Sequence, residues 1–329
     1  MGLTGRVLIT GGAGFLARGI YRRSRAESWP VRFTALSRDD AKHHKLQLQY
    51  PEVATVLGDV STIGERELAL LMRGFDMVIH AAASKYVDRA ELNALDTIAT
   101  NVEGSRRVAR AAQHANVGRA IAISTDKACH PVNTYGASKL LMERIWQEQS
   151  DAYTTFTGVR YGNVVGSTGS VLTLFEQQLI ERGYLTLTDP GMTRFWMTVD
   201  EAVDVILAAA EAPSRVMVIP KMRAASMHDV ACAALGYDEH RPLPLTGGQP
   251  QVKIVGVRPG EKKHEAIIHA QESVRVTEGD GFRAPWHLHA PGFPTPDDAR
   301  TFSVSSDDPP RGWIPIPELR EMVADAAEV

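Results

Sequence analysis

Short, nearly continuous apolar runs alternate with longer amphipathic segments over the first half of the chain. The apolar runs predict buried strands at residues 6–10, 31–36, 53–57, 77–80, 120–124 and 155–161. The segments between them have the apolar spacing of helices, at residues 14–27, 40–49, 64–73, 92–115 and 134–150. Because strands that alternate with helices form βαβ units, we predict a parallel sheet with helices on both faces.

The pattern loosens after residue 165. It still predicts helices at residues 171–183, 199–211 and 226–235, a strand at 216–219 and a last short helix that begins near Pro317. The proline-rich stretch 285–317 is predicted to be mostly irregular. We therefore expect an α/β protein with a Rossmann-type, doubly wound parallel sheet and a smaller mixed α/β lobe. The sheet domain takes residues 1–165, with 195–225 returning to it, and the lobe takes 166–194 and 226–329.

Composition narrows the possible classes of protein. The 329 residues carry a net charge of −3, so there is no basic field for nucleic acid or for an anionic membrane. The two cysteines, Cys129 and Cys232, exclude a disulfide framework and a cysteine-based zinc site, and we expect no metal. No apolar run is long enough for a membrane span, and no signal peptide is readable at the N-terminus. The expectation is a cytoplasmic globular enzyme.

A glycine-rich turn follows the first predicted strand and opens the first helix. In Thr10-Gly-Gly-Ala-Gly-Phe-Leu-Ala17 the glycines let the turn close and let backbone N–H groups approach a pyrophosphate. We predict that a nicotinamide dinucleotide contacts this turn, through Gly11, Ala13, Gly14, Phe15 and Leu16. A tight strand-to-helix turn without a ligand is the alternative interpretation of the same glycines.

The end of the second predicted strand bears on which dinucleotide is bound. NAD enzymes usually place an acid there to bind the ribose 2′-hydroxyl, whereas this chain has Ser37 and Arg38 before Asp39. Because an arginine can bind a 2′-phosphate, the sequence favours NADP, with NAD as the alternative. Arg38 could equally be a solvated loop residue, with Asp39 capping the next helix. Further cofactor contacts are expected after the third and fourth strands, from Asp59, Val60 and Ala81.

Five residues, at the end of the fifth predicted strand and in the helix that follows it, are of the types that form a catalytic group. Tyr135 and Lys139 lie on one face of a predicted helix, and an ammonium beside a phenol lowers the pKa of the phenol and makes it a usable base. The same lysine can hold the ribose of the cofactor. Upstream, Thr125, Asp126 and Lys127 end the fifth strand, at the edge of the sheet where ligands bind. A surface ion pair is the alternative interpretation of Asp126 and Lys127.

These motifs resemble those of the extended short-chain dehydrogenases/reductases and, more narrowly, the inverting UDP-N-acetylglucosamine 4,6-dehydratases of the polysaccharide-biosynthesis type. The narrower resemblance rests on Ser124-Thr-Asp-Lys-Ala128, Asn133-Thr-Tyr-Gly-Ala-Ser-Lys139 and Arg160-Tyr-Gly-Asn-Val-Val-Gly-Ser167. Met192-Thr-Arg-Phe-Trp196 and Val257-Arg-Pro-Gly-Glu-Lys262, with His264-Glu265, extend it into the lobe, so that it covers about residues 6–268. The Thr-Asp-Lys element is its sharpest part, since retaining dehydratases carry Thr-Asp-Glu there.

The resemblance implies an NADP-dependent 4,6-dehydratase that acts on UDP-N-acetylglucosamine and inverts C5. In that reaction the sugar is oxidised at C4, water is eliminated across C5 and C6, and hydride returns to C6. Tyr135 would remove the proton of the 4-hydroxyl, Lys127 the proton on C5, and Asp126 would protonate the departing 6-hydroxyl. Thr125 would bind the 4-oxygen. The alternatives are a 4-epimerase or another sugar-modifying dehydrogenase/reductase, and a non-catalytic NADP-binding protein.

The resemblance also implies binding residues and an oligomer. Lys85 and Asn101 would contact the cofactor. The UDP-sugar would contact Lys85, Asn163, Val171, Thr193, Arg194, Arg258 and Glu261. The helices near 92–115 and 134–150 carry more apolar positions than one sheet face needs, and in relatives such helices form a dimer contact. We therefore expect a homo-oligomer, a dimer or larger.

Several positions depart from the family pattern. Relatives commonly read Lys-His-Val-Pro where this chain reads Lys85-Tyr-Val-Asp88, and they have Asn at the place of His130. They have Arg at the places of Gly191 and Thr168, so this chain lacks two positive charges near the expected diphosphate. None of these departures touches the catalytic group, so they bear on the choice of sugar nucleotide rather than on the type of reaction.

Overall fold

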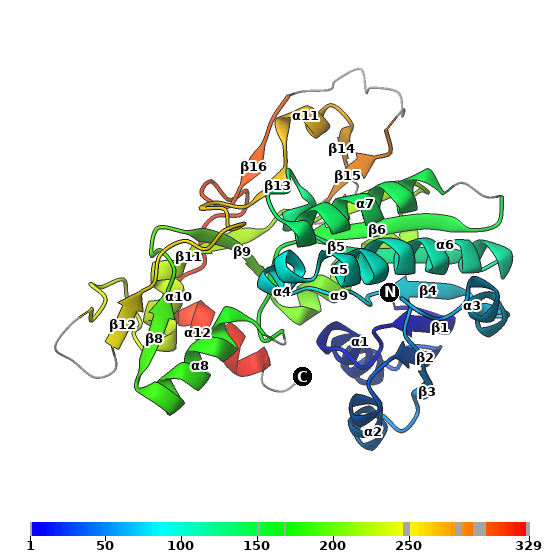
Figure 1. The fold of residues 1–329 in the computed structure, drawn as a ribbon, viewed down its shortest axis with the longest axis horizontal. Coiled ribbons are helices and arrows are strands. Elements are labelled where there is room, and N and C mark those ends of the chain that lie inside the picture. Colours follow the sequence, from blue (N-terminus) through cyan, green and yellow to red (C-terminus); the bar gives the residue numbers. More distant parts are fainter. Residues whose placement is uncertain are drawn as a thin grey trace.

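The computed structural model describes residues 2–149, 152–167, 169–245, 251–279, 285–291 and 301–326. Its largest element is a nine-stranded sheet (Figure 1), with the spatial order β14 (Val276–Glu278), β15 (Trp286–His289), β10 (Val216–Ile219), β6 (Thr155–Tyr161), β5 (Arg119–Thr125), β4 (Met77–His80), β1 (Gly5–Thr10), β2 (Val31–Ser37) and β3 (Ala54–Leu57). The strands from β10 to β3 are parallel, and β15 and β14 are antiparallel additions at one edge. The order 3-2-1-4-5-6 is that of a Rossmann-type sheet, which confirms the predicted fold class.

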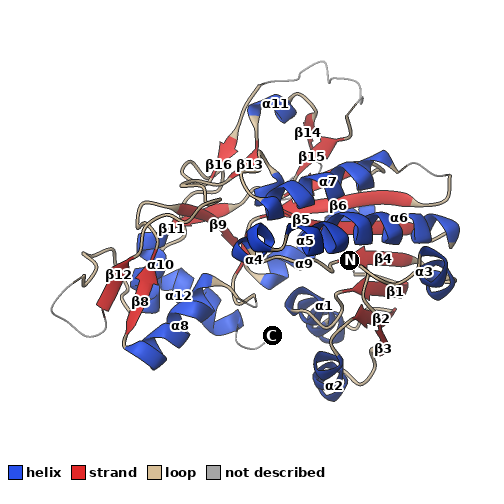
Figure 2. Cartoon of the chain, in the orientation of Figure 1, coloured by secondary structure: helices blue, strands red, loops and turns tan. Residues whose placement is uncertain are grey.

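Helices cover both faces of this sheet (Figure 2). One face carries α1 (Phe15–Ala26), α2 (Asp40–Gln49) and α9 (Val199–Glu211), and the other carries α3 (Glu65–Met72), α6 (Ser105–His114) and α7 (Thr134–Glu148). A strand with helices on both sides must be apolar on both sides, and Val7, Leu8 and Ile9 of β1 are accordingly all buried. None of the helices in the described ranges is long and apolar enough to cross a membrane.

The helix predicted at 92–115 begins only at Ala94 and is part of a run of four shorter helical pieces over residues 87–114. α4 (Val87–Leu92), α5 (Ala94–Ile98), a π-helical turn (Ala99–Gly104) and α6 follow one another. Asn93 separates the first two because its backbone, with φ −133° and ψ 59°, is outside the helical region. Asn101 in the π-helical turn is buried, and its amide donates to the Ser84 carbonyl and to Ser138 Oγ at 2.9 Å. The turn therefore ties the segment after β4 to α7.

The second half of the chain adds a lobe with an apolar core of its own. Its helices, α8 (Val171–Arg182), α10 (Met227–Ala234) and α12 (Ile316–Ala326), pack around Phe175, Val230 and Leu319. The chain also forms three small sheets, which join β7 (Asn163–Val164) and β11 (Arg223–Ser226) to β9 (Thr193–Met197), β8 (Tyr184–Leu187) to β12 (Gln251–Ile254), and β13 (Ala266–Ile268) to β16 (Val304–Ser305).

The division between sheet and lobe differs from the prediction in two places. β14 and β15 lie in the range 226–329 assigned to the lobe, yet they pair at the edge of the large sheet beside β10. Within 195–225, α9 and β10 pack in or on the large sheet, whereas β9 and β11 belong to a small one. The proline-rich stretch is therefore not irregular throughout. Pro285 precedes β15, a position where its missing N–H removes no ladder hydrogen bond.

A buried arginine between two glutamates joins β6 to its neighbours. Arg160 is fully buried and donates to Glu143 of α7 and to Glu272 of α11 (Ala270–Ser273), with a shortest distance of 2.6 Å to each. Its guanidinium also donates to the carbonyl oxygen of Ile267 at 3.0 Å. With the two longer contacts to the glutamates, every one of the guanidinium N–H groups has an acceptor.

Candidate active site

One large cavity, of about 720 Å³, opens at the carboxyl ends of the parallel strands. Residues that follow β1, β2, β4, β5 and β6 line it, together with residues of the lobe. Open α/β sheets bind their ligands at this edge. Of the residues that the sequence predicts to be functional, all except Asn101, Asp126 and Thr193 line the cavity.

The glycine turn after β1 has the shape that a diphosphate needs. Gly11 has φ +68°, and a Cβ there would lie 2.9 Å from the backbone nitrogen of Ala82, so only glycine fits. Gly14 precedes α1 and offers no side-chain cap, so the first N–H groups of α1 are left for a ligand in the cavity. This end of the cavity therefore fits the diphosphate of a dinucleotide.

Charged side chains at the end of β2 surround the expected place of the adenosine ribose. Asp39 is the N-cap of α2, where its carboxylate accepts from the backbone N–H of Lys42 at 3.0 Å. Arg38 is exposed and donates to Asp59 at 3.2 Å, and both Arg38 and Lys42 line the cavity. The acid at this strand end is engaged in capping, and two cations face the space beside it.

Asn101 and Thr193 lie behind the cavity wall. The Asn101 amide also accepts from the backbone N–H of Ser84 at 2.8 Å, so Ser84 and Ser138 together engage both its oxygen and its nitrogen. The Thr193 hydroxyl lies 2.8 Å from His264 Nδ1 and 2.7 Å from Ser306 Oγ. Both side chains hold neighbouring segments together, so any effect on a ligand passes through those segments.

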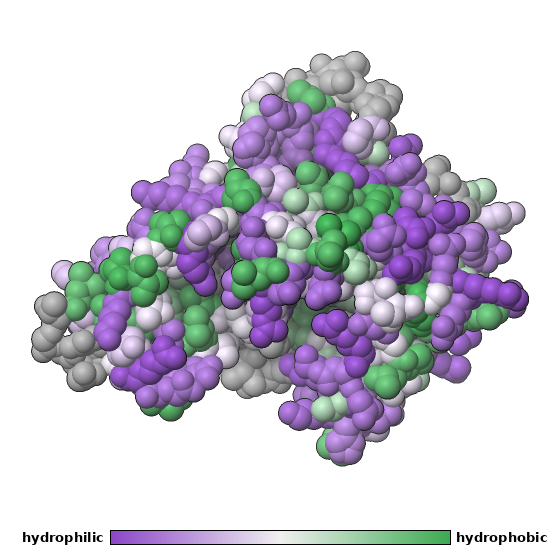
Figure 3. Space-filling view, in the orientation of Figure 1, coloured by the Kyte–Doolittle hydropathy of each residue, from purple (hydrophilic) through white to green (hydrophobic). Residues whose placement is uncertain are grey.

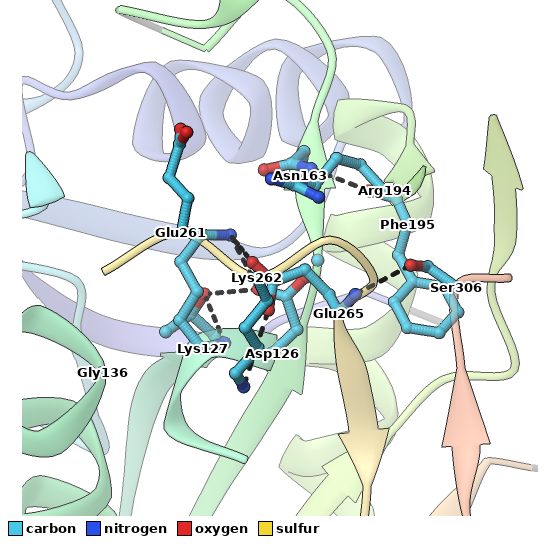
Figure 4. Close-up of polar contacts among 12 residues, drawn as sticks. Asp126, Lys127, Gly136, Asn163, Arg194, Phe195, Glu261, Lys262, Glu265 and Ser306 are labelled. Carbon is cyan, nitrogen blue, oxygen red and sulfur yellow. Dashed lines mark hydrogen bonds and ion pairs between the residues drawn. The ribbon is translucent and has the colours of Figure 1, made fainter. Parts of the chain in front are cut away.

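Asp126 and Lys127 form an ion pair in the short 3-10 turn that follows β5 (Figure 4). Lys127 Nζ lies 3.1 Å from Asp126 Oδ1, and the Thr125 hydroxyl donates to the same oxygen at 2.9 Å. Asp126 is fully buried, and its Oδ2 accepts no hydrogen bond from any described residue. The alternative of a surface ion pair is thereby excluded. A buried carboxylate oxygen without a hydrogen-bond donor is uncommon in folded proteins and is one mark of a functional group.

The carboxylates around Lys127 govern its proton affinity. Burial by itself lowers the pKa of Lys127, but Asp126 and Glu265 outweigh this effect and raise the pKa above its ordinary value. Arg194 opposes them more weakly. Lys127 is therefore an ammonium in the resting protein.

Tyr135 and Lys139 lie on the first turns of α7, and both line the cavity. Burial raises the pKa of the Tyr135 phenol to about 12, although Lys127 and a hydrogen bond with Thr125 lower it. The sequence-based expectation that Lys139 lowers this pKa needs correction. The Lys139 ammonium donates to the carbonyl oxygen of Ile123 at 2.5 Å, and burial lowers the pKa of Lys139 itself to about 8. The cation that acts on the phenol is Lys127.

The lobe side of the cavity is lined by Asn163, Val171, Arg194, Arg258 and Glu261. Arg258 donates to Glu261 at 2.7 Å, and Arg194 donates to the carbonyl oxygen of Thr193 at 2.8 Å. Three of these side chains are charged, which suits a phosphorylated ligand.

One of the departures from the family pattern falls on this side. At Gly191, a Cβ would lie 3.8 Å from Lys263 Nζ, so a cation from a neighbouring segment stands close to the place where relatives carry Arg. Thr168 lies outside the described residues. The ammonium of Lys263 therefore partly replaces the positive charge that is missing at Gly191.

Among the described residues, one group has the geometry to hold a metal ion: His228, Asp229 and His240, whose ligand atoms lie within 4.8 Å of one another. The two imidazoles stack at 3.9 Å between centroids, and His240 Nδ1 lies 2.7 Å from Asp229 Oδ1. None of the three lines the cavity, so the group is separate from the candidate active site.

The sequence profile of the family described as "Polysaccharide biosynthesis protein" matches residues 7–284. The chain belongs to this family. It is similar to the inverting UDP-N-acetylglucosamine 4,6-dehydratase of Campylobacter jejuni, with 33% identity over 96% of each chain. It is also similar to the UDP-glucose 4-epimerase of Rickettsia bellii, with 32% identity over 85% of this chain and 82% of that one. The family resemblance found in the motifs is confirmed.

Solved structures agree with this assignment. Pen from Bacillus thuringiensis superimposes with a TM-score of 0.84 at 28% identity, over 99% of this chain and 98% of that one. DesIV from Streptomyces venezuelae, a dTDP-glucose 4,6-dehydratase solved with NAD, has a TM-score of 0.67 at 24% identity, over 78% and 86% of the two chains. This second likeness shows a shared fold.

In this polysaccharide-biosynthesis protein, Glu265 is a cavity residue beside Lys127 that sequence reasoning missed, as it missed Lys42 near the end of β2. Glu265 is 3% exposed, lines the cavity, and its Oε1 lies 3.6 Å from Lys127 Nζ. It stands far along the chain from Asp126 and Lys127, and no spacing rule connects the two segments. The only signal was that the family resemblance extends through His264-Glu265, and it carried no role for the residue.

Proposed function

We propose that this protein is an NADP-dependent nucleotide-sugar 4,6-dehydratase, a hydro-lyase that acts on UDP-N-acetylglucosamine and inverts C5. The observation that carries the proposal is the Asp126–Lys127 ion pair, 3.1 Å apart, in which Asp126 is fully buried and Lys127 lines the same cavity as Tyr135. The glycine turn at the other end of the same cavity fits a dinucleotide. Similarity to the C. jejuni dehydratase over 96% of the chain supports this reaction.

Each side chain of the group has a separate task. A bound nicotinamide would supply the acceptor for hydride from sugar C4 and its return to C6. Tyr135 takes the proton of the 4-hydroxyl, while Thr125 is placed to bind the 4-oxygen. The ketone formed at C4 acidifies the hydrogen on C5, and Lys127 removes that proton. Asp126 gives its proton to the 6-hydroxyl, which leaves as water. A solvent proton then enters C5 on its opposite face, and Tyr135 returns the proton of the 4-hydroxyl to solvent.

The Asp126–Lys127 contact also explains how a lysine held as an ammonium can act as a base. Transfer of one proton from Lys127 to Asp126 across 3.1 Å leaves a neutral amine beside a carboxylic acid. These are the base for C5 and the acid for the 6-hydroxyl that the elimination needs. After elimination, Lys127 holds the proton from C5 and Asp126 is ionised, which restores the resting state.

A 4-epimerase is the second candidate, because relatives with that name match most of the chain. An epimerase returns hydride to the carbon from which it was taken, and for this Tyr135 suffices. It has no use for an acid and a base directed at C5 and C6. Asp126 and Lys127 provide that pair, so dehydration accounts for more of the site.

The test is incubation of the purified protein with UDP-N-acetylglucosamine in D2O, followed by mass spectrometry and proton NMR. We expect loss of one water, one deuterium at C5 and inverted configuration at that carbon. A 4-epimerase would give a product of unchanged mass without deuterium at C5. Failure to convert any member of a panel of UDP-sugars would contradict both candidates.

Lys127→Ala tests the residue on which the proposal depends. Removal of the C5 base should abolish dehydration while cofactor binding at the glycine turn persists. Lys221→Ala is the matched control, because Lys221 is a partly exposed lysine outside the cavity, paired with Glu278. Equal product yields from Lys127→Ala and the control would exclude Lys127 as the base.

We propose NADP as the cofactor because of the charges at the end of β2. Arg38 and Lys42 line the cavity there and can bind a 2′-phosphate. Asp39, which would otherwise be free to bind a 2′-hydroxyl, caps α2. NAD is present in the DesIV structure, so the choice between the two cofactors is a property to be measured on this chain.

We also propose that the protein forms a homo-oligomer through the face that carries α4, α5 and α7. Apolar side chains gather over these helices (Figure 3), and Leu92 and Leu95 are 84% and 82% exposed. Ile98, Val132 and Leu141 of the same region are also exposed. An apolar face of this kind is stabilised when a second copy covers it. Leu92→Glu with Leu95→Glu should lower the mass measured by light scattering, whereas Ile180→Glu on α8 should not.

A further inference from the structure

Glu265 has no task in the reaction as described, although it enters the active-site cavity (Figure 4). Its Oε1 lies 3.6 Å from Lys127 Nζ. Its Oε2 lies 3.7 Å from Lys262 Nζ and accepts no hydrogen bond from any described residue. A buried carboxylate with an unbonded oxygen is unfavourable for folding, so something in the structure must hold it there.

The backbone around Glu265 is fixed from two sides. Its N–H donates to Ser306 Oγ at 2.9 Å, and its carbonyl oxygen accepts from the N–H of Ser306 at 2.8 Å. Ser306 Oγ is in turn 2.7 Å from Thr193 Oγ1. These contacts join Glu265 to β9 and to the end of β16, so the carboxylate is held beside Lys127 by the fold itself.

Lys127 is therefore placed between two carboxylates from different segments. Asp126 approaches from the same turn at 3.1 Å, and Glu265 approaches from the segment before β13 at 3.6 Å. The other charged or titratable groups that act on Lys127 are Arg194, which disfavours its charge, and Tyr135. The nearest competing cation for Glu265 is Lys262, whose ammonium also donates to the carbonyl oxygen of Cys129 at 2.7 Å.

We propose that Glu265 is a positioning residue that holds the Lys127 ammonium from a second segment and sets how strongly Lys127 binds a proton. The role of Glu265 in catalysis rests on the proposed dehydratase function. One proton leaves C5 and goes to Lys127, and one leaves Asp126 with the departing hydroxyl. Glu265 neither gives nor takes a proton in these steps, and its carboxylate beside Lys127 stabilises the ammonium that the elimination produces, which favours removal of the C5 proton.

The direct test measures the proton affinity of Lys127 in the cofactor-free protein. Competitive labelling with acetic anhydride at a series of pH values, read by peptide mass spectrometry, reports the pH at which Lys127 loses its proton. Glu265→Gln should lower that pH by about one to three units, as expected for loss of an opposite charge at this range. Lys262→Met removes the competing cation and should move the pH upward. Because the two variants have opposite predicted signs, either one tests the proposal if the other fails to fold.

Glu261→Gln is the matched control. It removes a carboxylate from the same cavity, but that carboxylate pairs with Arg258 at 2.7 Å rather than with Lys127. The labelling curve of Lys127 should therefore not move in this variant. An unchanged curve in Glu265→Gln, or an equal shift in Glu261→Gln, would overturn the proposal.

Activity then separates the proposal from the function on which it rests. If the wild type dehydrates the sugar nucleotide, the acidic limb of its kcat/KM profile should move to lower pH in Glu265→Gln, in step with the labelling curve. A merely structural role would lower the rate without moving this limb. If the labelling curve moves but no sugar nucleotide is dehydrated by the wild type, the dehydratase function fails while the coupling of Glu265 to Lys127 stands.

Discussion

Replacement of Arg160 by Met should destabilise the protein strongly, because it removes a charge that two buried carboxylates need. The guanidinium makes five hydrogen bonds, to Glu143, Glu272 and the carbonyl oxygen of Ile267, and its side chain is fully buried. Met fills a similar volume, so the main change is electrostatic. Glu143 retains one donor, the Ser124 hydroxyl at 2.6 Å, and Glu272 retains two, the Cys129 thiol at 3.3 Å and the His269 N–H at 3.2 Å.

The expected loss in the free energy of unfolding follows from the two carboxylates, which remain buried without their cation. Breaking a buried ion pair by removing one partner costs about 3–5 kcal/mol, since the remaining charge stays buried without compensation. Summing the five hydrogen bonds separately would overestimate the loss, because the stranded carboxylates can take up protons and become neutral. We therefore expect a decrease of about 3–5 kcal/mol in the free energy of unfolding at pH 7, a large part of the 5–15 kcal/mol that is typical of proteins.

The pH dependence has a definite sign. Burial raises the pKa of Glu272, but Arg160 outweighs it and holds the pKa below the ordinary value, so in the wild type Glu272 contributes stability that is lost as pH falls. In Arg160→Met burial is opposed only by the hydrogen bonds from the His269 N–H and the Cys129 thiol, so the pKa of Glu272 is higher than in the wild type and less stability is lost as pH falls. The difference between the two proteins should therefore narrow between pH 7 and pH 5.

Urea unfolding followed by tryptophan fluorescence at pH 7 and pH 5 measures both effects. The control is the triple variant Arg160→Met, Glu143→Gln, Glu272→Gln, which removes the stranded charges and should recover most of the loss. A loss below about 1 kcal/mol for Arg160→Met, or a difference that widens at pH 5, would refute the reasoning.

Two further predictions concern the ends of the cavity. Arg38→Ala should weaken NADP binding more than NAD binding, by about 1.5–3 kcal/mol, the contribution of a hydrogen bond to a charged group. Titration calorimetry with both cofactors checks this, and Lys45→Ala, which removes an exposed cation of α2 outside the cavity, should leave the ratio of the two affinities unchanged. Lys139→Met should stabilise the fold while abolishing activity. Burial lowers the pKa of Lys139 from 10.5 to about 8, so the folded state bears a penalty of about 3 kcal/mol below pH 8 that disappears as pH rises through 10.5. A gain in melting temperature at pH 7 that persists at pH 11 would contradict this account.

The sheet could be predicted from the sequence because its information is local. A strand covered by helices on both sides must be apolar throughout, and Val7, Leu8 and Ile9 carry that pattern within one short run. The breaks at Asn93 and in the π-helical turn escaped prediction because the apolar spacing continues through them. β15 escaped because its partner, β10, lies far away in the chain and the surrounding prolines indicate loops.

The site shows the same division between local and distant information. Asp126, Lys127 and Tyr135 are close in sequence, and the fold places the buried Asp126 against Lys127, which lines the same cavity as Tyr135. Glu265 could not be found in this way, because its approach to Lys127 depends on contacts with Ser306 and Thr193. His130 is a further case. Its φ of +46° is a conformation that Asn adopts more readily than His, which accounts for the Asn in relatives, and here the ring stacks on His269 at 4.7 Å between centroids.

Ser306 matters for anyone who recombines members of this family. The family profile ends at residue 284, as if the segment beyond it could be exchanged freely between relatives. Yet the buried Ser306 hydroxyl and N–H hold the backbone of Glu265 beside Lys127. In a hybrid joined at the end of the profile, Glu265 would come from one parent and Ser306, which holds its backbone, would come from the other. The safer junction lies beyond residue 306, where the remaining helix packs in the lobe.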